Sequence, residues 1–163
     1  MPVESMKDLF VETLKDIYYA EKHILKALPS MVKKADGDKL KNALEAHRKE
    51  TEGQIGRLEQ VFKLCETAAR GKKCDAIEGI LAEAKEHMDE IKNEAVLDAG
   101  IIASAQAVEH YEITRYGTLI AWAKQLGMDE VAGLLEQTLE EEKNADELLT
   151  EIAERSANQK AAA

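Results

Sequence analysis

Apolar residues recur along the chain at intervals of three and four positions, the spacing that predicts amphipathic α-helices. Long stretches consist of Ala, Leu, Glu, Lys and Gln, which are good helix formers, and β-branched runs are too short to indicate strands. We expect four long helices, over residues 4–34, 38–67, 93–126 and 129–154. A shorter amphipathic helix is expected over residues 74–92.

The connections between these helices predict the topology. Tight turns, at residues 36–38 and at Gly127, join the first pair and the last pair of long helices. A bundle in which every neighbour is antiparallel would not need the long segment 71–92, so this segment indicates two hairpins joined by a crossover. That arrangement is the ferritin-like four-helix bundle. We therefore predict an all-α, ferritin-like domain over residues 1–156, followed by a disordered tail at 157–163.

Each long apolar stripe is interrupted by polar residues near the middle of its helix. The interruptions are Glu21 in the first long helix, His47, Glu50 and Gln54 in the second, Glu109 and Glu112 in the third, and Glu142 and Asp146 in the fourth. A buried, unpaired carboxylate costs several kcal/mol or becomes neutral through a pKa shift. A lone Glu on such a stripe is more often hydrogen-bonded than a ligand, but convergence of four favours bound cations.

The two hairpins also resemble a diverged repeat. The spacing from Glu21 to Glu50 equals the spacing from Glu112 to Glu141. Helix phase alone leaves open whether Glu141 or Glu142 faces the core of the fourth helix.

Charge and composition narrow the possible partners and compartment. The 163-residue chain has 22 basic and 32 acidic residues, a formal net charge of −10, which argues against nucleic acid and against anionic membrane surfaces. The N-terminus has no apolar signal region, and no apolar run is long enough to span a bilayer. We expect a cytoplasmic protein in which Cys65 and Cys74 are reduced, with a regulatory disulfide as the alternative.

Four segments resemble the YciF-like stress protein family (DUF892) of the ferritin-like superfamily. They are DLFVETLKDIYYAEKHILKALP, HRKETEGQIGRLEQVF, AQAVEHYEITRYGTLIAWAKQLG and LLEQTLEEEKNADELL, which together cover nearly all of the chain outside the crossover and tail. The resemblance implies a bacterial cytoplasmic protein with a ferritin-like fold, a homodimer, and a role in stress. It implies no particular reaction.

The sequence departs from the ligand pattern of the wider superfamily. That pattern includes two Glu-x-x-His motifs, whereas Glu50 is followed by Gly53 and Glu141 by Asn144 at the histidine positions. The third helix instead offers a Glu pair that is similar to rubrerythrin-type proteins. His47, one turn before Glu50, is an alternative nitrogen ligand. The expected metal ligands are Glu21, Glu50, Glu109, Glu112 and Glu142, with Gln54 and Asp146 as weaker ligands.

An oxygen-rich ligand set suits two hard or borderline ions, iron first and manganese second. We therefore expect a dinuclear metal protein that reacts with a small oxidant, dioxygen or peroxide. One alternative is a non-enzymatic helical stress or interaction protein with a vestigial metal site. Another is a storage or DNA-protecting cage, which the acidic composition disfavours.

Overall fold

The computed structural model describes residues 2–163 and is helical almost throughout. The elements are α1 (Met6–Lys34), α2 (Asp38–Leu64), α3 (Asp75–Glu90), α4 (Glu94–Gln125), α5 (Asp129–Ile152), the π-helix η1 (Ala153–Ala157) and α6 (Asn158–Ala162). No strand occurs within residues 2–163, and the predicted all-α helical bundle is confirmed. No helix of this part of the chain is long and apolar enough to cross a membrane.

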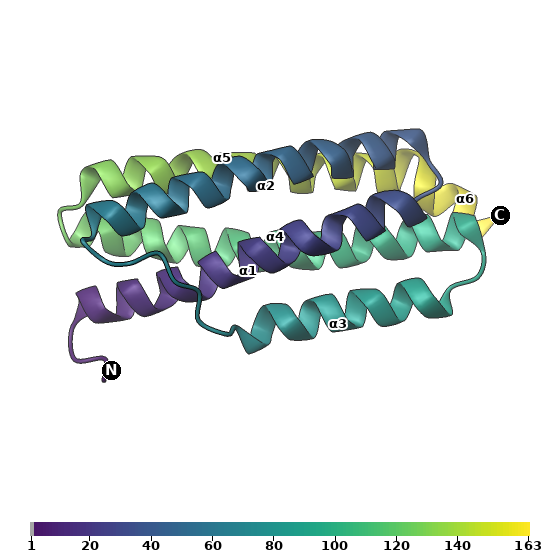
Figure 1. Cartoon of the computed structure of the whole chain (residues 1–163). Helices are drawn as coiled ribbons and strands as arrows, with labels where there is room; N and C mark the ends of the chain where they lie inside the picture. The colour runs from purple at the N-terminus through teal and green to yellow at the C-terminus, as the bar shows by residue number, and fades with distance from the viewer. Residues whose placement is uncertain (1) are drawn as a thin grey trace.

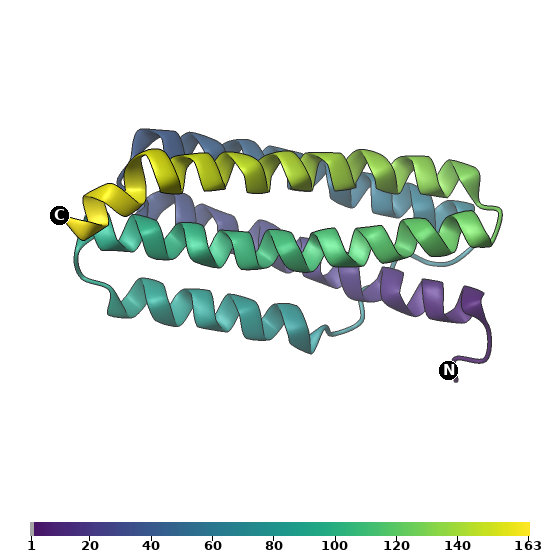
Figure 2. The ribbon, with the colours of Figure 1, turned by 180° about the vertical axis from the view of Figure 1, so that it is seen from behind.

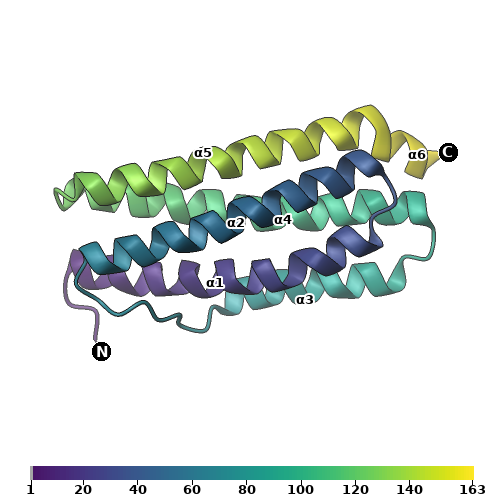
Figure 3. The same ribbon diagram turned by 45° about the horizontal axis from the view of Figure 1, so that its top comes forward.

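The four long helices form two antiparallel hairpins, α1–α2 and α4–α5, which pack against each other (Figure 1). After α2, the crossover and α3 carry the chain back along the bundle, so that α4 runs parallel to α2 (Figure 1). The reverse view shows α3 outside the bundle, alongside α4 (Figure 2). Seen from a tilted direction, α1 lies between α2 and α3 (Figure 3). This arrangement leaves α3 as a cover on the α1–α4 side of the core.

Specific contacts hold the turns of the bundle. The Asp98 carboxylate at the start of α4 accepts hydrogen bonds from the backbone N–H groups of Asp36 and Gly37, both at 2.8 Å, and so ties the α1–α2 turn to α4. Gly127 adopts a φ of 70° between α4 and α5, a conformation that glycine takes without strain. Both turns fall where the sequence predicts them.

The first part of the crossover runs close along α1. A Cβ atom at Gly71 would lie 3.1 Å from Tyr19 Cβ, so the absence of a side chain permits this approach. Cys65 and Cys74 are both buried and free. The Cys74 thiol lies 2.9 Å from the Tyr111 hydroxyl of α4.

The C-terminal end differs from the predicted disordered tail. The helix continues beyond Ile152 through η1 and α6 as far as Ala162, and these segments pack against α4. Ala153 and Ala157 are buried there. Because alanine is a strong helix former and small enough for close packing, SANQKAAA extends α5 instead of fraying.

Candidate metal centre

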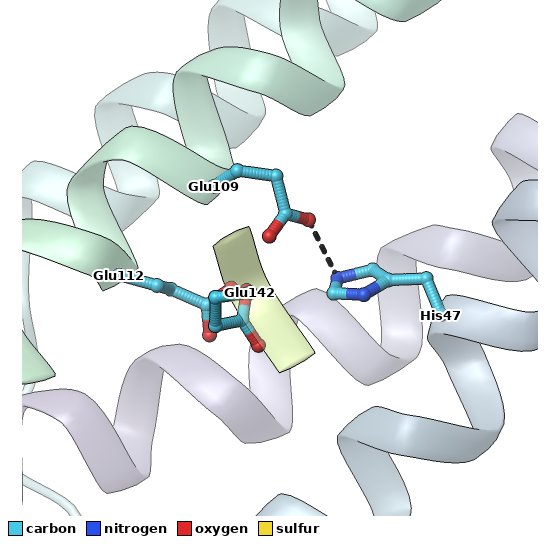
Figure 4. Close-up of side chains that lie close together, drawn as sticks. All are labelled: His47, Glu109, Glu112 and Glu142. Carbon is cyan, nitrogen blue, oxygen red and sulfur yellow. Dashed lines mark ion pairs between the residues drawn. The ribbon is translucent and has the colours of Figure 1, made fainter. Parts of the chain in front are cut away.

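A cluster of ionisable side chains lies in the middle of the bundle, enclosed by the apolar core. His47 comes from α2, Glu109 and Glu112 from α4, and Glu142 from α5. Each can contribute one ligand atom such that all four atoms lie within 4.8 Å of one another, and all four side chains are buried. Figure 4 shows Glu112 and Glu142 against each other, with Glu109 and His47 beside them. Helical spacing explains why Glu109 and Glu112 point the same way, since residues three positions apart lie on the same face of a helix.

His47 and Glu109 form an ion pair within the cluster. His47 Nε2 lies 2.8 Å from Glu109 Oε1 (Figure 4), while Nδ1 lies 3.7 Å from the Glu50 carboxylate. The Nε2 distance is that of a hydrogen bond, but the angle is not, and both ring nitrogens lack a hydrogen-bond partner. Burial lowers the pKa of His47, but the carboxylates of Glu109, Glu50 and Glu142 together outweigh burial and raise it well above its usual value.

Glu21 reaches the same region from α1. It is fully buried, and its carboxylate accepts a 2.6 Å hydrogen bond from the Tyr116 hydroxyl of α4. Burial, followed by repulsion from Glu142, raises the pKa of Glu21 to about 8. Glu21 therefore completes a set in which every helix of the two hairpins contributes a buried ionisable residue.

The carboxyl groups of the cluster also perturb one another. Burial and the charge of Glu142 raise the pKa of Glu112 well above its ordinary value. Burial and Glu109 do the same for Glu142. Removing like charges this close together from water is unfavourable, so without a cation these side chains hold protons.

The polar atoms of this core have too few partners. Ten buried side-chain nitrogen and oxygen atoms in the described part of the chain have no hydrogen-bond partner. All ten belong to Glu21, His47, Gln54, Glu109, Glu112 and Glu142. Buried polar atoms in native proteins are normally paired, and unpaired atoms gathered in one place indicate a missing ligand. A set of four carboxylates, one imidazole and one amide suits iron or manganese.

Comparison with known proteins gives the family of the chain. The model of the family described as "Domain of unknown function (DUF892)" matches residues 5–162. The chain belongs to the DUF892 family. Protein YciF of Escherichia coli strain K12 is 43% identical over 162 residues, which are 99% of this chain and 98% of that protein.

Solved structures of similar proteins have the same fold. The crystal structure of the E. coli stress protein YciF has a TM-score of 0.91 at 42% identity, covering 96% of this chain and 99% of that one. YcfI from Rhodopseudomonas palustris has a TM-score of 0.89 at 50% identity, covering 91% of this chain and 94% of that one. A Xanthomonas campestris protein, with a TM-score of 0.73 at 24% identity, shares the fold alone; it covers 93% of this chain and 92% of that one.

The DUF892 fold separates the predicted ligands into two groups. Glu21, Gln54, Glu109, Glu112 and Glu142 lie in the buried core. Glu50 lies at its edge with 40% of its side chain exposed. Asp146, whose side chain is 19% exposed, is engaged elsewhere: it accepts a hydrogen bond from Gln106 Nε2 at 3.2 Å and contacts His110 Nε2 at 3.0 Å.

The structure also gives the orientation of the two neighbouring glutamates of α5. Glu142 points into the core, whereas Glu141 accepts a bidentate pair of hydrogen bonds from Arg57 of α2. Arg57 also donates to Thr138 at 2.8 Å. Glu141 therefore joins α2 to α5 outside the cluster.

Sequence reasoning gave His47 only as an alternative ligand and did not consider Thr51. The structure places His47 among the core carboxylates, and Thr51 is fully buried beside it. Thr51 Oγ1 donates to the His47 carbonyl at 2.8 Å. The signal for His47 was present in the sequence. His47 lies three positions after Leu44 and seven positions, or two helical turns, before Gln54, so it shares a helix face with the Leu40–Leu44 stripe.

Proposed function

We propose that this chain is a stress protein whose core binds two iron or manganese ions and reacts with dioxygen or peroxide. The observation that carries the proposal is the set of ten unpartnered polar atoms on six buried side chains. The E. coli relative is called a stress protein, which supports the biological setting. The arrangement of two hairpins and a crossover is that of ferritin-like bundles, which hold such centres between facing helices.

His47, Glu109, Glu112 and Glu142 would hold the metals, with Glu21 and Gln54 next to them. Metal cations would neutralise carboxylates that otherwise repel one another in a medium of low dielectric constant. The bound metals would supply the redox chemistry. The ligand set has fewer histidines than that of the wider superfamily and is therefore richer in oxygen atoms. Such a set favours hard ions over zinc.

The surrounding residues of the chain fix the ligands and exclude water. Tyr116 orients Glu21 through its 2.6 Å hydrogen bond. Fully buried Ile17, Leu44 and Leu58 lie along the same helices on either side of the polar level and keep solvent from it. Such a closed apolar setting strengthens the electrostatic interactions of a bound ion.

A second candidate is a non-enzymatic helical stress protein with a vestigial site. The raised pKa values of Glu21, Glu112 and Glu142 favour it, because protonated carboxyls allow the core to exist without metal. In that case the function would depend on the surface of the protein.

Elemental analysis of protein purified without added metal or chelator tests the proposal. About two iron or manganese ions per chain are expected, and Glu142→Gln should lower this ratio because the amide removes a charged ligand. Glu140→Gln is the matched control, since Glu140 is exposed on the same helix and should leave the ratio unchanged. No metal in the purified protein, and none after reconstitution, would favour the vestigial site.

A further inference from the structure

A small cavity reaches the candidate metal centre from one side of the bundle. It has a volume of about 20 Å³ and lies between α2, α4 and α5. His47 and Glu109 form its buried end, and Ala43, Ala145 and Leu148 lie toward the surface. The unpartnered Glu109 Oε2 and the two ring nitrogens of His47 belong to the residues at this buried end.

An open groove lies on the surface next to this cavity. The groove has a volume of about 450 Å³ and lies on the surface between α2 and α5. Ala43 and Leu148 line both the groove and the cavity, so these two side chains lie where the two spaces approach each other. Leu148 is 43% exposed. We call the cavity and the inner part of the groove the α2–α5 passage.

Side-chain size explains why space remains here. The wall contains Ala43, Ala105 and Ala145, and larger residues at these positions would close the contact between helices. A second space, between α1, α3 and α4, also touches His47 and Glu109. Its volume is about 10 Å³, and it shares no lining residue with the surface groove between α3 and α4. The space between α2, α4 and α5, by contrast, shares Ala43 and Leu148 with a surface groove.

The dimensions and the lining of the passage select its occupant. A volume of about 20 Å³ has room for one molecule of the size of water. Apart from His47 and Glu109 at the buried end, every residue that lines the cavity is Ala or Leu. Along the stretch lined by Ala and Leu, a polar or charged molecule would lose its hydrogen bonds to water without replacement, which costs about 1–3 kcal/mol for each group. A diatomic gas makes no such hydrogen bonds in water and therefore does not have this cost.

We propose that the α2–α5 passage admits dioxygen to the core, with Leu148 at its mouth. The inference rests on the proposed function, because dioxygen entry has a role only where the centre binds a redox metal. It adds the substrate class, a small apolar oxidant, and the route.

Xenon binding to metal-free crystals tests the passage without depending on metal. Xenon occupies dry apolar cavities, so we expect an ordered xenon atom beside Ala43, Ala145 and Leu148 in the unmodified protein. Ala145→Leu should remove it by filling the space. Ala107→Leu is the matched control, because Ala107 is exposed on α4 and lines neither space at the centre. Xenon in only the α1–α3–α4 space would overturn the proposed route.

Oxidation of the ferrous protein by dioxygen gives the second readout. Ala145→Leu should slow oxidation by at least about tenfold, which corresponds to about 1.4 kcal/mol of added barrier, and Leu148→Ala should accelerate it. Leu148 is partly exposed, so its truncation leaves the folded core intact and keeps the test valid even where Ala145→Leu fails to fold.

Metal counts on the same samples separate the two hypotheses. Two metals per chain, with no xenon in the passage and an unchanged rate in both variants, would overturn the passage alone. Xenon in the passage of a protein that takes up no metal would overturn the proposed function, and with it the role of the passage.

Discussion

Glu112 is the carboxylate on which the repulsion within the core converges. Its pKa is raised by burial first and then by the charges of Glu142, Glu21 and Glu109. A side chain of the same shape without the charge would relieve that repulsion but would offer a poorer metal ligand. Stability and metal binding are therefore expected to change in opposite directions at this position.

Glu112→Gln should stabilise the metal-free protein and weaken metal binding. Relief of about 1 kcal/mol would raise the melting temperature by roughly 2–4 °C in a chain of this size. Addition of iron or manganese should raise the melting temperature of the unmodified protein, because a ligand that binds the native state stabilises it, and should raise that of the variant much less. Differential scanning calorimetry with and without metal measures both effects. A lower melting temperature for the metal-free variant would contradict the prediction.

Glu21 makes the stability of the metal-free protein depend on pH. Its pKa is about 8 in the folded protein against 4.5 ordinarily. Between these values the folded state holds a proton that the unfolded chain has released, so the free energy of unfolding falls as pH rises. The expected slope is on the order of 1 kcal/mol per pH unit between pH 4.5 and 8. Urea denaturation across this range measures it, and Glu21→Gln should make the slope shallower while Glu112 and Glu142 continue to contribute.

Metal should oppose this loss of stability, because metal binding requires deprotonated ligands and strengthens with pH. A metal-induced stabilisation that shrinks from pH 6 to pH 8 would contradict the assignment of these carboxylates as ligands.

The residue scale is also where prediction from sequence was least complete. The interrupted stripes predicted that carboxylates meet in the core, and Glu21, Glu109, Glu112 and Glu142 are buried there. The interrupted stripe also suggested Glu50, yet Glu50 is partly exposed and the next residue, Thr51, is the buried one. Each residue turns a helix by 100°, and a stripe of apolar residues does not fix the phase to that precision.

At the scale of elements, one buried carboxylate joins three helices. Asp98 belongs to α4 and accepts hydrogen bonds from two backbone N–H groups in the turn between α1 and α2. Both distances are 2.8 Å, and the residue is 8% exposed. The contact holds the end of the first hairpin against the start of the second.

Asp98→Ala should destabilise the bundle by about 2 kcal/mol, because two N–H groups lose a charged acceptor. Chemical denaturation measures the change. Glu83→Ala is the control, since Glu83 is exposed on α3 and its substitution should change the free energy of unfolding by less than about 0.5 kcal/mol. Equal effects of the two substitutions would show that Asp98 does not hold the turn.

Element existence was more predictable than element ends. All five helices expected from the pattern occur, because each buries a continuous stripe. The second ends at Leu64 instead of residue 67, and the last extends through η1 and α6. The extension depends on a surface of α4 that receives Ala153 and Ala157, and packing between distant segments is not visible in a local pattern.

At the scale of the whole molecule, the order of tight turn, long crossover and tight turn was enough to predict the hairpin arrangement.

Self-association of the chain is the remaining prediction at this scale. Val3, Met6 and Leu9 are exposed at the N-terminal end of the chain, and covering apolar surface favours self-association.

Light scattering should give a homodimer, twice the 18.1 kDa of the chain. Analysis over a range of concentrations measures the equilibrium. A monomer at all concentrations would contradict the prediction, and a large closed assembly would instead favour a storage cage.

The topology determines when the centre can form during folding. Each hairpin closes through contacts between neighbouring helices, with little loss of chain entropy, whereas docking the hairpins must also close the crossover loop. His47 lies in the first hairpin, and Glu109, Glu112 and Glu142 lie in the second. The second hairpin can gather its three carboxylates early, but the imidazole joins them only on docking. Metal affinity would therefore report on the last stage of folding, and a metal bound early would draw the two halves together.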